Sequence, residues 1–279
     1  MVLALTVAAL SAFAANSLLC RAALRTSSID PASLTIVRLL AGAATLAFLA
    51  WARDRRAPRT EPSGGTFASA IALFVYAAAF SFAYVQLDAG TGALILFGAV
   101  QLTMVGWGLF RGERPKTNEW LGFLVALAGL VILTFPSLTA PPLVGAGLML
   151  SAGIAWGVYS LRGRGIADPL RTTASNFERA LLFTVALFAW LAFSGGPHGS
   201  STGALFAAAS GALASGIGYS LWYAALRGLS ATRAGIVQLA VPVVAASGGV
   251  AFLGERPSLR LLAAGVAILG GIALATLRR

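Results

Sequence analysis

The chain alternates between long apolar runs and short polar connections. A helix needs about 20 apolar residues to cross a bilayer. Ten runs approach or exceed that length, at about 2–20, 32–52, 67–87, 91–110, 119–135, 142–161, 172–193, 203–226, 232–253 and 259–277. Proline and glycine interrupt the pattern between runs, as at Asp30-Pro31 and Asp168-Pro169. Because such runs do not alternate apolar with polar residues, a membrane β-barrel is excluded, and the pattern predicts an all-α integral membrane protein.

The first apolar run, from Val2 to Cys20, has a second interpretation as a signal peptide. Ala12-Phe13-Ala14 resembles the small-residue cleavage site of such peptides. No basic residue precedes the run, however, and signal peptides usually begin with one. The run also has a counterpart in the second half of the chain. We therefore expect it to be a retained membrane span.

The composition agrees with a surface that faces lipid. The 279 residues are 58% hydrophobic and only 10% charged, whereas a soluble domain carries about a quarter charged residues. The formal net charge of +11 would suggest nucleic acid as a partner if the charges formed one basic tract. They are instead spread in short clusters between apolar runs. The sequence therefore predicts the lipid bilayer as a partner, and no nucleic acid.

The basic residues are divided unequally between the two sides of the predicted membrane. If the N-terminus is cytoplasmic, fourteen arginines and lysines fall inside and four fall outside. Cytoplasmic connections of membrane proteins carry such an excess. We therefore expect both termini to lie in the cytoplasm.

The two halves of the chain resemble each other at an offset near 140 residues. Gly112-Glu113-Arg114-Pro115 recurs as Gly254-Glu255-Arg256-Pro257, and several further matches keep nearly the same offset, which indicates a duplicated unit. Five spans is an odd number, so the second unit, 140–279, enters the membrane from the side opposite to the first, 1–139. The expected fold is ten transmembrane helices in a five-plus-five inverted-topology repeat. Such repeats are common in transporters that work by alternating access, although a duplication that built only a scaffold is the alternative.

A family resemblance rests on several of these residues. Pro31 with Arg38, the two Gly-Glu-Arg-Pro motifs, and Gln238 to Pro242 resemble the EamA type of the drug/metabolite transporter superfamily, over the whole chain. The chain is most similar to bacterial exporters of amino acids, including aromatic ones. The resemblance implies a multi-pass protein of the bacterial inner membrane. Helices one to four and six to nine would surround a central cavity, with five and ten at the periphery. Val100 stands opposite Pro242 in the repeat, so span four lacks the proline that would kink it to match span nine.

Three ionisable residues fall well inside predicted spans, away from their first residues, where a charge is costly and is often functional. Arg38 and Arg179 occupy equivalent positions in the two halves, toward opposite sides of the membrane. Either one could hold a substrate carboxylate, but both are near enough to a helix end to snorkel or to bond its carbonyl groups instead. Glu178 is the single acid in the interior of a span. It is a candidate proton carrier, and pairing with a nearby arginine is the alternative.

Aromatic and amide side chains within the spans predict the wall of a substrate pocket. Residues four apart share a helix face, which aligns Tyr76, Phe80 and Tyr84. Amides are costly against lipid, so they should face protein or a wet cavity. Aromatics near span ends, such as Tyr84 and Trp107, have an alternative role in the interfacial belt. The candidate substrate-binding residues are Asn16, Arg38, Tyr76, Phe80, Tyr84, Gln101, Trp107, Trp156, Tyr159, Arg179, Tyr219 and Gln238.

The remaining chemistry argues against an enzyme. The single histidine, His198, lies in a polar connection, and the sequence has no His-Glu-x-x-His motif and no paired acids within the spans. It also lacks the Gly-x-x-x-x-Gly-Lys-Ser/Thr loop that binds nucleotide phosphates. We therefore predict no metal and no cofactor. A passive channel stays open as an alternative to a carrier.

The predicted pocket narrows the class of solute. Span one contains no acid, which argues against a transporter limited to cations. Two single arginines on opposite sides supply little charge for a phosphorylated sugar. An aromatic pocket with amides and few charges suits a neutral or zwitterionic solute with an apolar part. Together with the family resemblance, this predicts a secondary transporter, functional as a monomer, that exports amino acids or similar small metabolites; drug-like organic solutes are the alternative.

Overall fold

The fold is a bundle of helices that agrees closely with the predicted spans. The computed structural model describes residues 1–26, 29–56, 64–135, 141–253 and 256–276, and every regular element within those ranges is a helix. Within the same ranges, ten helical segments are long and apolar enough to cross a membrane. The predicted boundary between the halves, 139/140, lies outside the described residues.

Five uninterrupted helices make up the first half. They are α1 (Val2–Thr26), α2 (Pro31–Arg56), α3 (Phe67–Tyr84), α4 (Ala89–Phe110) and α5 (Thr117–Thr134).

Three of the five spans in the second half are interrupted. Its first span is α6 (Leu143–Arg162) and its last is α13 (Leu259–Thr276). Span seven consists of α7 (Pro169–Ala180), η2 (Leu181–Phe183) and α8 (Thr184–Phe193); span eight consists of α9 (Ser201–Ala209), η3 (Ser210–Ile217) and α10 (Gly218–Leu226); span nine consists of α11 (Ala231–Gln238) and α12 (Ala240–Leu253).

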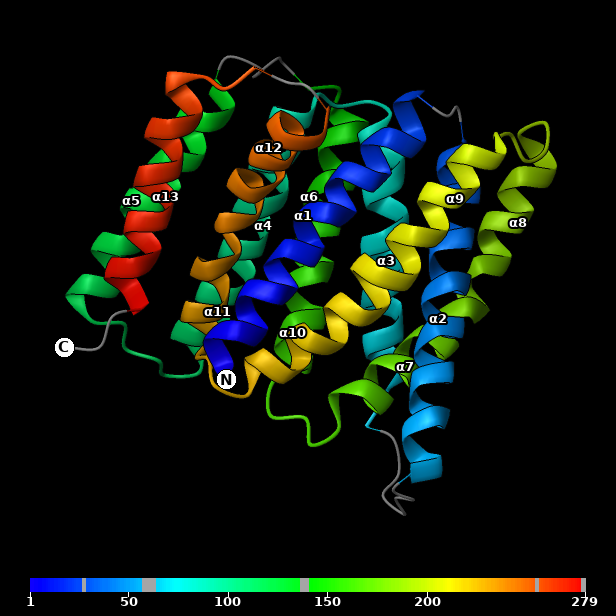
Figure 1. The fold of residues 1–279 in the computed structure, drawn as a ribbon, viewed down its shortest axis with the longest axis horizontal. Coiled ribbons are helices and arrows are strands. Elements are labelled where there is room, and N and C mark those ends of the chain that lie inside the picture. The colour runs from blue at the N-terminus through cyan, green and yellow to red at the C-terminus, as the bar shows by residue number, and fades with distance from the viewer. Residues whose placement is uncertain (27–28, 57–63, 136–140, 254–255, 277–279) are drawn as a thin grey trace.

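The direction of the helices confirms the inverted repeat. The first helix begins, and the last helix ends, at the same end of the bundle, which we call the terminal end (Figure 1). Because each half has five spans, α6 starts at the opposite end, which we call the distal end, and crosses against the direction of α1. The all-α, ten-span, five-plus-five fold predicted from the sequence is therefore correct.

Helices α5 and α13 pack on each other at one side of the bundle (Figure 1), which confirms their peripheral position. Their backbones approach closely at glycines. A Cβ atom on Gly271 would lie 2.5 Å from the carbonyl oxygen of Gly122, and one on Gly122 would lie 2.7 Å from the amide nitrogen of Ala275. Small residues permit this kind of contact between membrane helices.

Spans four and nine differ in the way that the repeat comparison suggested. Helix α4 runs without a break past Val100, whereas span nine is interrupted after Gln238. Pro242 has no N–H group to donate to the carbonyl group of Gln238, so the helical hydrogen-bond ladder fails at this point. The absence of a proline from span four accounts for the missing kink.

Span eight contains a π-helical segment, η3, that the sequence did not predict. Helix α2 lies directly against it. A Cβ atom on Gly211 would lie 2.8 Å from the carbonyl carbon of Arg38 and closer still to its oxygen. Such π segments are rare and frequently occur at functional sites.

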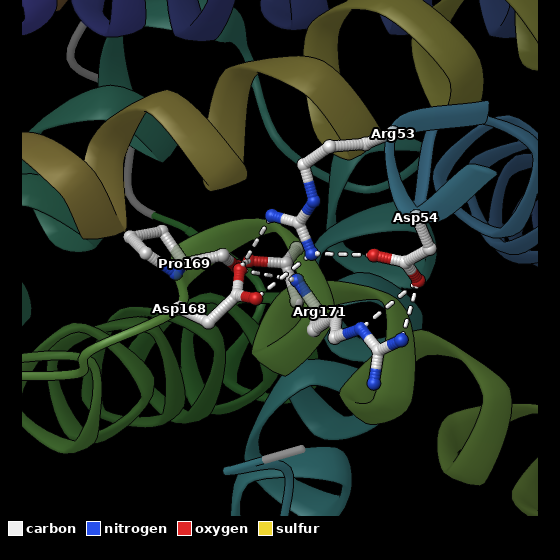
Figure 2. A network of polar contacts seen from close by, with 6 residues as sticks. Arg53, Asp54, Asp168, Pro169 and Arg171 are labelled. Atoms are coloured by element: carbon white, nitrogen blue, oxygen red, sulfur yellow. Dashed lines mark hydrogen bonds and ion pairs between the residues drawn. The ribbon is translucent and has the colours of Figure 1, made fainter. Parts of the chain in front are cut away.

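Charged side chains join the two halves at the terminal end. Arg53 of α2 donates two hydrogen bonds to Asp168 at the start of α7, at 2.9 and 2.8 Å (Figure 2). Asp54 beside it bonds to Arg171 and lies 3.4 Å from Arg53. Asp168 also caps α7 by accepting from the backbone N–H of Arg171. We call these four residues the α2–α7 lock.

The first Gly-Glu-Arg-Pro motif supplies a second connection at the terminal end. Glu113 accepts hydrogen bonds from the backbone N–H groups of Ala231 and Thr232 and from the Thr232 hydroxyl, at 2.8 to 3.0 Å, and it lies 3.4 Å from Arg164. Burial alone would raise the pKa of Glu113, but these bonds and the arginine hold it below its ordinary value. The motif thus caps α11. Its counterpart at Gly254-Glu255 lies outside the described residues.

Candidate functional site

A small cavity of about 30 Å³ lies at the centre of the bundle. That is about the share of liquid volume taken by one water molecule, so the centre has little empty space. We call it the inner cavity. It is lined by side chains from α1, α3, α4, α6, α10, α11 and α12. The predicted residues that line it are Asn16, Tyr76, Phe80, Trp156, Tyr219 and Gln238.

Trp156 stands at the middle of an aromatic cluster drawn from three other spans. Its ring centroid lies 4.7 Å from that of Tyr219, 4.9 Å from that of Tyr76 and 5.1 Å from that of Phe13. Its indole N–H donates to the side-chain oxygen of Gln238 at 2.6 Å. Aromatic pairs at these separations add roughly 0.5–1.5 kcal/mol each beyond the burial of their area. The cluster therefore holds the two halves together.

Tyr159, another predicted site residue, lies one turn further along α6, toward the terminal end. It is fully buried and its ring lies 5.8 Å from that of Trp156 and 4.9 Å from that of Tyr223. Tyr223 in turn donates a hydrogen bond to the Tyr159 carbonyl oxygen at 3.0 Å. Tyr159 thus extends the aromatic cluster and does not line the inner cavity.

Arg38 is buried directly behind the cavity wall, with 1% of its surface exposed. Its guanidinium donates to Ser215 Oγ at 2.9 Å, to the Tyr219 hydroxyl at 2.5 Å and to the Tyr76 hydroxyl at 3.4 Å. It therefore neither snorkels nor bonds helix-end carbonyl groups. These contacts bring one of the two predicted arginines to the centre of the molecule.

Asn16 is held by a second hydroxyl from η3. Ser210 Oγ donates to Asn16 Oδ1 at 2.6 Å, and the thiol of Cys20 approaches the same oxygen at 3.7 Å. The amide nitrogen of Asn16 lies 3.5 Å from the Tyr76 hydroxyl. The π-helical segment thus supplies Ser210 and Ser215 to the two polar residues at the centre.

Phe13 and Ser210 are two of the residues at this centre that sequence reasoning missed. Phe13 contacts Trp156, Tyr219 and Trp222 edge-on, and its position three residues before Asn16 on one helix face was a usable signal. Ser210 carries no signal of its own, because serine is common in spans and its role depends on the π-helical turn.

A larger cavity of about 270 Å³ opens toward the distal end, and we call it the vestibule. Tyr84, Thr134 and Arg260, all close to helix ends on that side, belong to its wall. Tyr84 is also packed on Phe80, with ring centroids 4.4 Å apart. The vestibule shares Ser17, Leu96, Phe97 and Val241 with the inner cavity. The centre is therefore approached from the distal end.

Spans two and seven stand behind the inner cavity, contrary to the expectation that every helix other than five and ten would surround it. Within the described residues, neither α2 nor α7 supplies a lining side chain to this cavity. They reach it indirectly through Tyr219, which touches Arg38 and lies 6.0 Å, ring to ring, from Phe177. The close packing of α2 on η3 explains this position, because η3 and α10 stand between α2 and the cavity.

Three further predicted site residues, in addition to Arg38 and Tyr159, line neither cavity. Gln101 donates to the carbonyl oxygen of Gly235 at 2.8 Å and so joins α4 to α11. Trp107 is 43% exposed near the terminal end of α4, where an interfacial belt is expected. Arg179 is half-buried and bonds Ser175, one turn earlier on α7. Each position follows from the rotation of its helix, which the sequence pattern did not resolve.

Glu178 is exposed on α7 and lines neither cavity. Among the ion pairs formed by described residues, none includes it. The predicted pairing with an arginine is therefore not seen in this part of the chain. In the described ranges, moreover, no group of three or more His, Cys, Asp or Glu side chains could hold a metal ion.

Known proteins are similar to this chain in sequence and in fold. An uncharacterized protein of Pseudomonas aeruginosa is 56% identical over 272 residues, which cover 98% of this chain and 93% of the relative. A probable terminal-alkyne amino-acid exporter of Streptantibioticus cattleyicolor is 26% identical over 250 residues, covering 87% of this chain and 83% of its own. A crystal structure at 22% identity has the same fold, with a TM-score of 0.80 over 99% of this chain and 98% of that one.

The family assignment follows from the pattern of conserved positions that defines the EamA-like transporters. That pattern matches residues 1–135 and again residues 143–277. The two matches correspond to the two five-span halves of the structure, with little of the chain left over. The protein is therefore a multi-pass membrane transporter, not an enzyme, and it belongs to the EamA-like transporter family.

Proposed function

We propose that the protein is a secondary transporter that exports amino acids or similar small metabolites with an apolar part, and that it functions as a monomer. The observation that carries this proposal is the buried cluster of aromatic and amide side chains where the two inverted halves meet. Midplane sites between inverted repeats are typical of secondary transporters. The named exporter among the relatives, which is described as acting on a terminal-alkyne amino acid, supports the same class of solute.

The arrangement of the cavities supports alternating access. A vestibule leads to the cluster from the distal end. At the terminal end, the α2–α7 lock and the cap that Glu113 places on α11 connect the two halves. Opening one end and closing the other would carry a bound solute past the cluster. A passive channel would instead need both ends open at once.

The aromatic cluster is the part of the site that should select the size of the solute. We expect Trp156→Ala to raise the half-saturating concentration for a large apolar amino acid by about tenfold, which corresponds to about 1.4 kcal/mol of lost contact. A small amino acid such as alanine should be affected much less, because it does not reach the ring. Uptake of both solutes into liposomes containing the purified protein measures the two constants.

Trp156→Phe is the matched control. It keeps an aromatic ring but removes the hydrogen bond to Gln238. Its half-saturating concentration for the large amino acid should lie between those of the wild type and the alanine variant. Equal losses for large and small amino acids would refute the size selection. Saturable movement of a drug-like solute, with no uptake of any amino acid, would favour the alternative substrate class, while non-saturating flux without counter-flow would favour a channel.

We also propose that both termini are cytoplasmic, on the basis of the arginine bias, so that the vestibule opens outward. Thr117 at the terminal end and Thr202 at the distal end are both exposed. In a Cys20→Ser background, Thr202→Cys should react with a membrane-impermeant maleimide added to intact cells. Thr117→Cys should react only after the cells are opened. The opposite pattern would reverse the orientation and the direction in which the vestibule faces.

A further inference from the structure

The side-chain oxygens of Asn16 and Gln238 already accept hydrogen bonds, whereas one guanidinium nitrogen of Arg38 has no partner among the described residues. Asn16 Oδ1 accepts from Ser210, and Gln238 Oε1 accepts from Trp156, each at 2.6 Å. In contrast, Nη1 of Arg38 is buried and has no hydrogen-bond partner among the described residues. Buried polar groups normally have partners, and an exception calls for an explanation. The open position at this centre therefore suits a ligand that accepts hydrogen bonds.

The charge of Arg38 is also uncompensated within the described part of the chain. Its hydrogen-bond partners are the neutral hydroxyl groups of Ser215, Tyr219 and Tyr76. None of the ion pairs that the described residues form includes Arg38. Among the described residues, no aspartate or glutamate lines either the inner cavity or the vestibule. A buried cation without a counter-ion is costly, so an anion bound beside it would be strongly favoured.

The geometry places this charge within one side chain of the cavity. Tyr76 and Tyr219 line the inner cavity and contact the guanidinium through their hydroxyl groups. The guanidinium carbon also lies 5.2 Å from the ring centroid of Tyr76 and 5.9 Å from that of Phe80. The inner cavity is too small for a solute in this state, so the aromatic rings must move when one enters. That movement would bring the solute against Arg38.

We infer that the central site recognises the carboxylate of its substrate and makes no demand on the amino group. This inference rests on the proposed transport function and narrows its substrate class to monocarboxylates with an apolar or aromatic tail, of which apolar amino acids are one kind. Arg38 and the two tyrosine hydroxyls bind the carboxylate, while Trp156 and its neighbours hold the tail. An ammonium group meets no anionic partner here. An organic amine without a carboxylate is rejected, because its charge repels that of Arg38.

The preference for a carboxylate can be tested on the wild-type protein with three probes that share a phenyl tail. They are 3-phenylpropanoate, phenylalanine and 2-phenylethylamine. We expect the two carboxylates to bind with similar affinity and the amine to bind at least about tenfold more weakly. Binding to the purified full-length protein is followed by tryptophan fluorescence, and competition is followed by uptake into liposomes. The inference is wrong if the amine binds as tightly as 3-phenylpropanoate, or if only phenylalanine binds.

Variants at Arg38 test its role directly. Arg38→Met removes the charge and the donors but keeps a long side chain, and replacing a buried charge by an apolar residue is often tolerated. It should weaken binding of 3-phenylpropanoate by about tenfold or more, with Arg38→Lys losing less. Arg227→Met, at an exposed position, is the control and should bind like the wild type. Unchanged binding of 3-phenylpropanoate to a folded Arg38→Met protein would overturn the inference, and the wild-type probes decide it if that variant does not fold.

Failure of the proposed function and failure of this inference give different results. If no amino acid is transported, yet 3-phenylpropanoate binds in an Arg38-dependent way, the inference holds and the amino-acid proposal fails. If amino acids are transported and 3-phenylpropanoate neither binds nor competes, the inference fails and the transport proposal stands.

Discussion

Gly211→Ala is expected to abolish transport, because the added methyl group has no space. A Cβ atom there would lie 2.8 Å from the carbonyl carbon of Arg38 and 2.9 Å from its Cα atom. Both atoms belong to the backbone of α2, so no side-chain movement can relieve the clash. Helix α2 would have to move away from η3, which would break the bond between Arg38 and Ser215. Overpacking of this kind costs about 1–3 kcal/mol in addition to the lost function.

The loss of transport is measured as uptake per amount of folded protein. The loss of stability is measured as the thermal unfolding temperature in detergent. Gly106→Ala in α4 is the matched control, since a Cβ atom there meets nothing within 4 Å. Alanine is favoured over glycine inside a helix by about 1 kcal/mol, so the control should be at least as stable as the wild type. Wild-type uptake by Gly211→Ala would show that the close approach of α2 and η3 is not needed for function.

Asp168→Asn is expected to shift the protein toward a state that is open at the terminal end. Asparagine can still cap α7, as aspartate does through the N–H of Arg171, but it cannot pair ionically with Arg53. The ion pair is partly exposed, with 31% and 16% of the two side chains accessible, so we assign it about 1–2 kcal/mol, below the value of a buried pair. That energy corresponds to a shift of roughly 5- to 30-fold in the population of the open state.

The shift can be measured by the labelling rate of a buried cysteine on the locked side. Ala174 of α7 is 4% exposed, and Ala174→Cys in a Cys20→Ser background should react slowly until the terminal end opens. Adding Asp168→Asn should accelerate labelling from that side. Adding Arg53→Gln as well should accelerate it little further, because the two side chains act as one pair. An unchanged labelling rate would mean that the α2–α7 lock does not hold the terminal end closed.

The ten spans were predictable because the bilayer acts on each segment separately. A helix that crosses the membrane must satisfy its own backbone and be apolar over a set length, so length and hydropathy suffice to find it. The predicted run 203–226 is the observed span Ser201–Leu226 within two residues. The inverted arrangement followed from parity, since five spans per half leave no other orientation for the second half. Both results needed no knowledge of which helices touch.

The composition of the candidate site was partly predictable for a related reason. Amides and buried aromatics inside a span must face protein, and Asn16, Trp156, Tyr219 and Gln238 do meet around the inner cavity. The same argument could not separate them from Gln101, whose amide donates a hydrogen bond to the backbone of α11. Which neighbour a polar side chain finds depends on the rotation and contacts of its helix, and the membrane solvent does not decide these.

Arg38 and Arg179 show where sequence reasoning ends. The repeat places them at equivalent positions, and the cost of a membrane charge marked both as candidates. Only the folded bundle separates them: Arg38 is sealed in by Ser215 and Tyr219, which lie 177 and 181 residues further along the chain, whereas Arg179 bonds Ser175 on its own helix. Hydropathy and spacing are local properties of the chain, but the burial of a charge depends on distant segments that pack around it. The π-helical segment that carries Ser215 to Arg38 exists only in the tertiary structure.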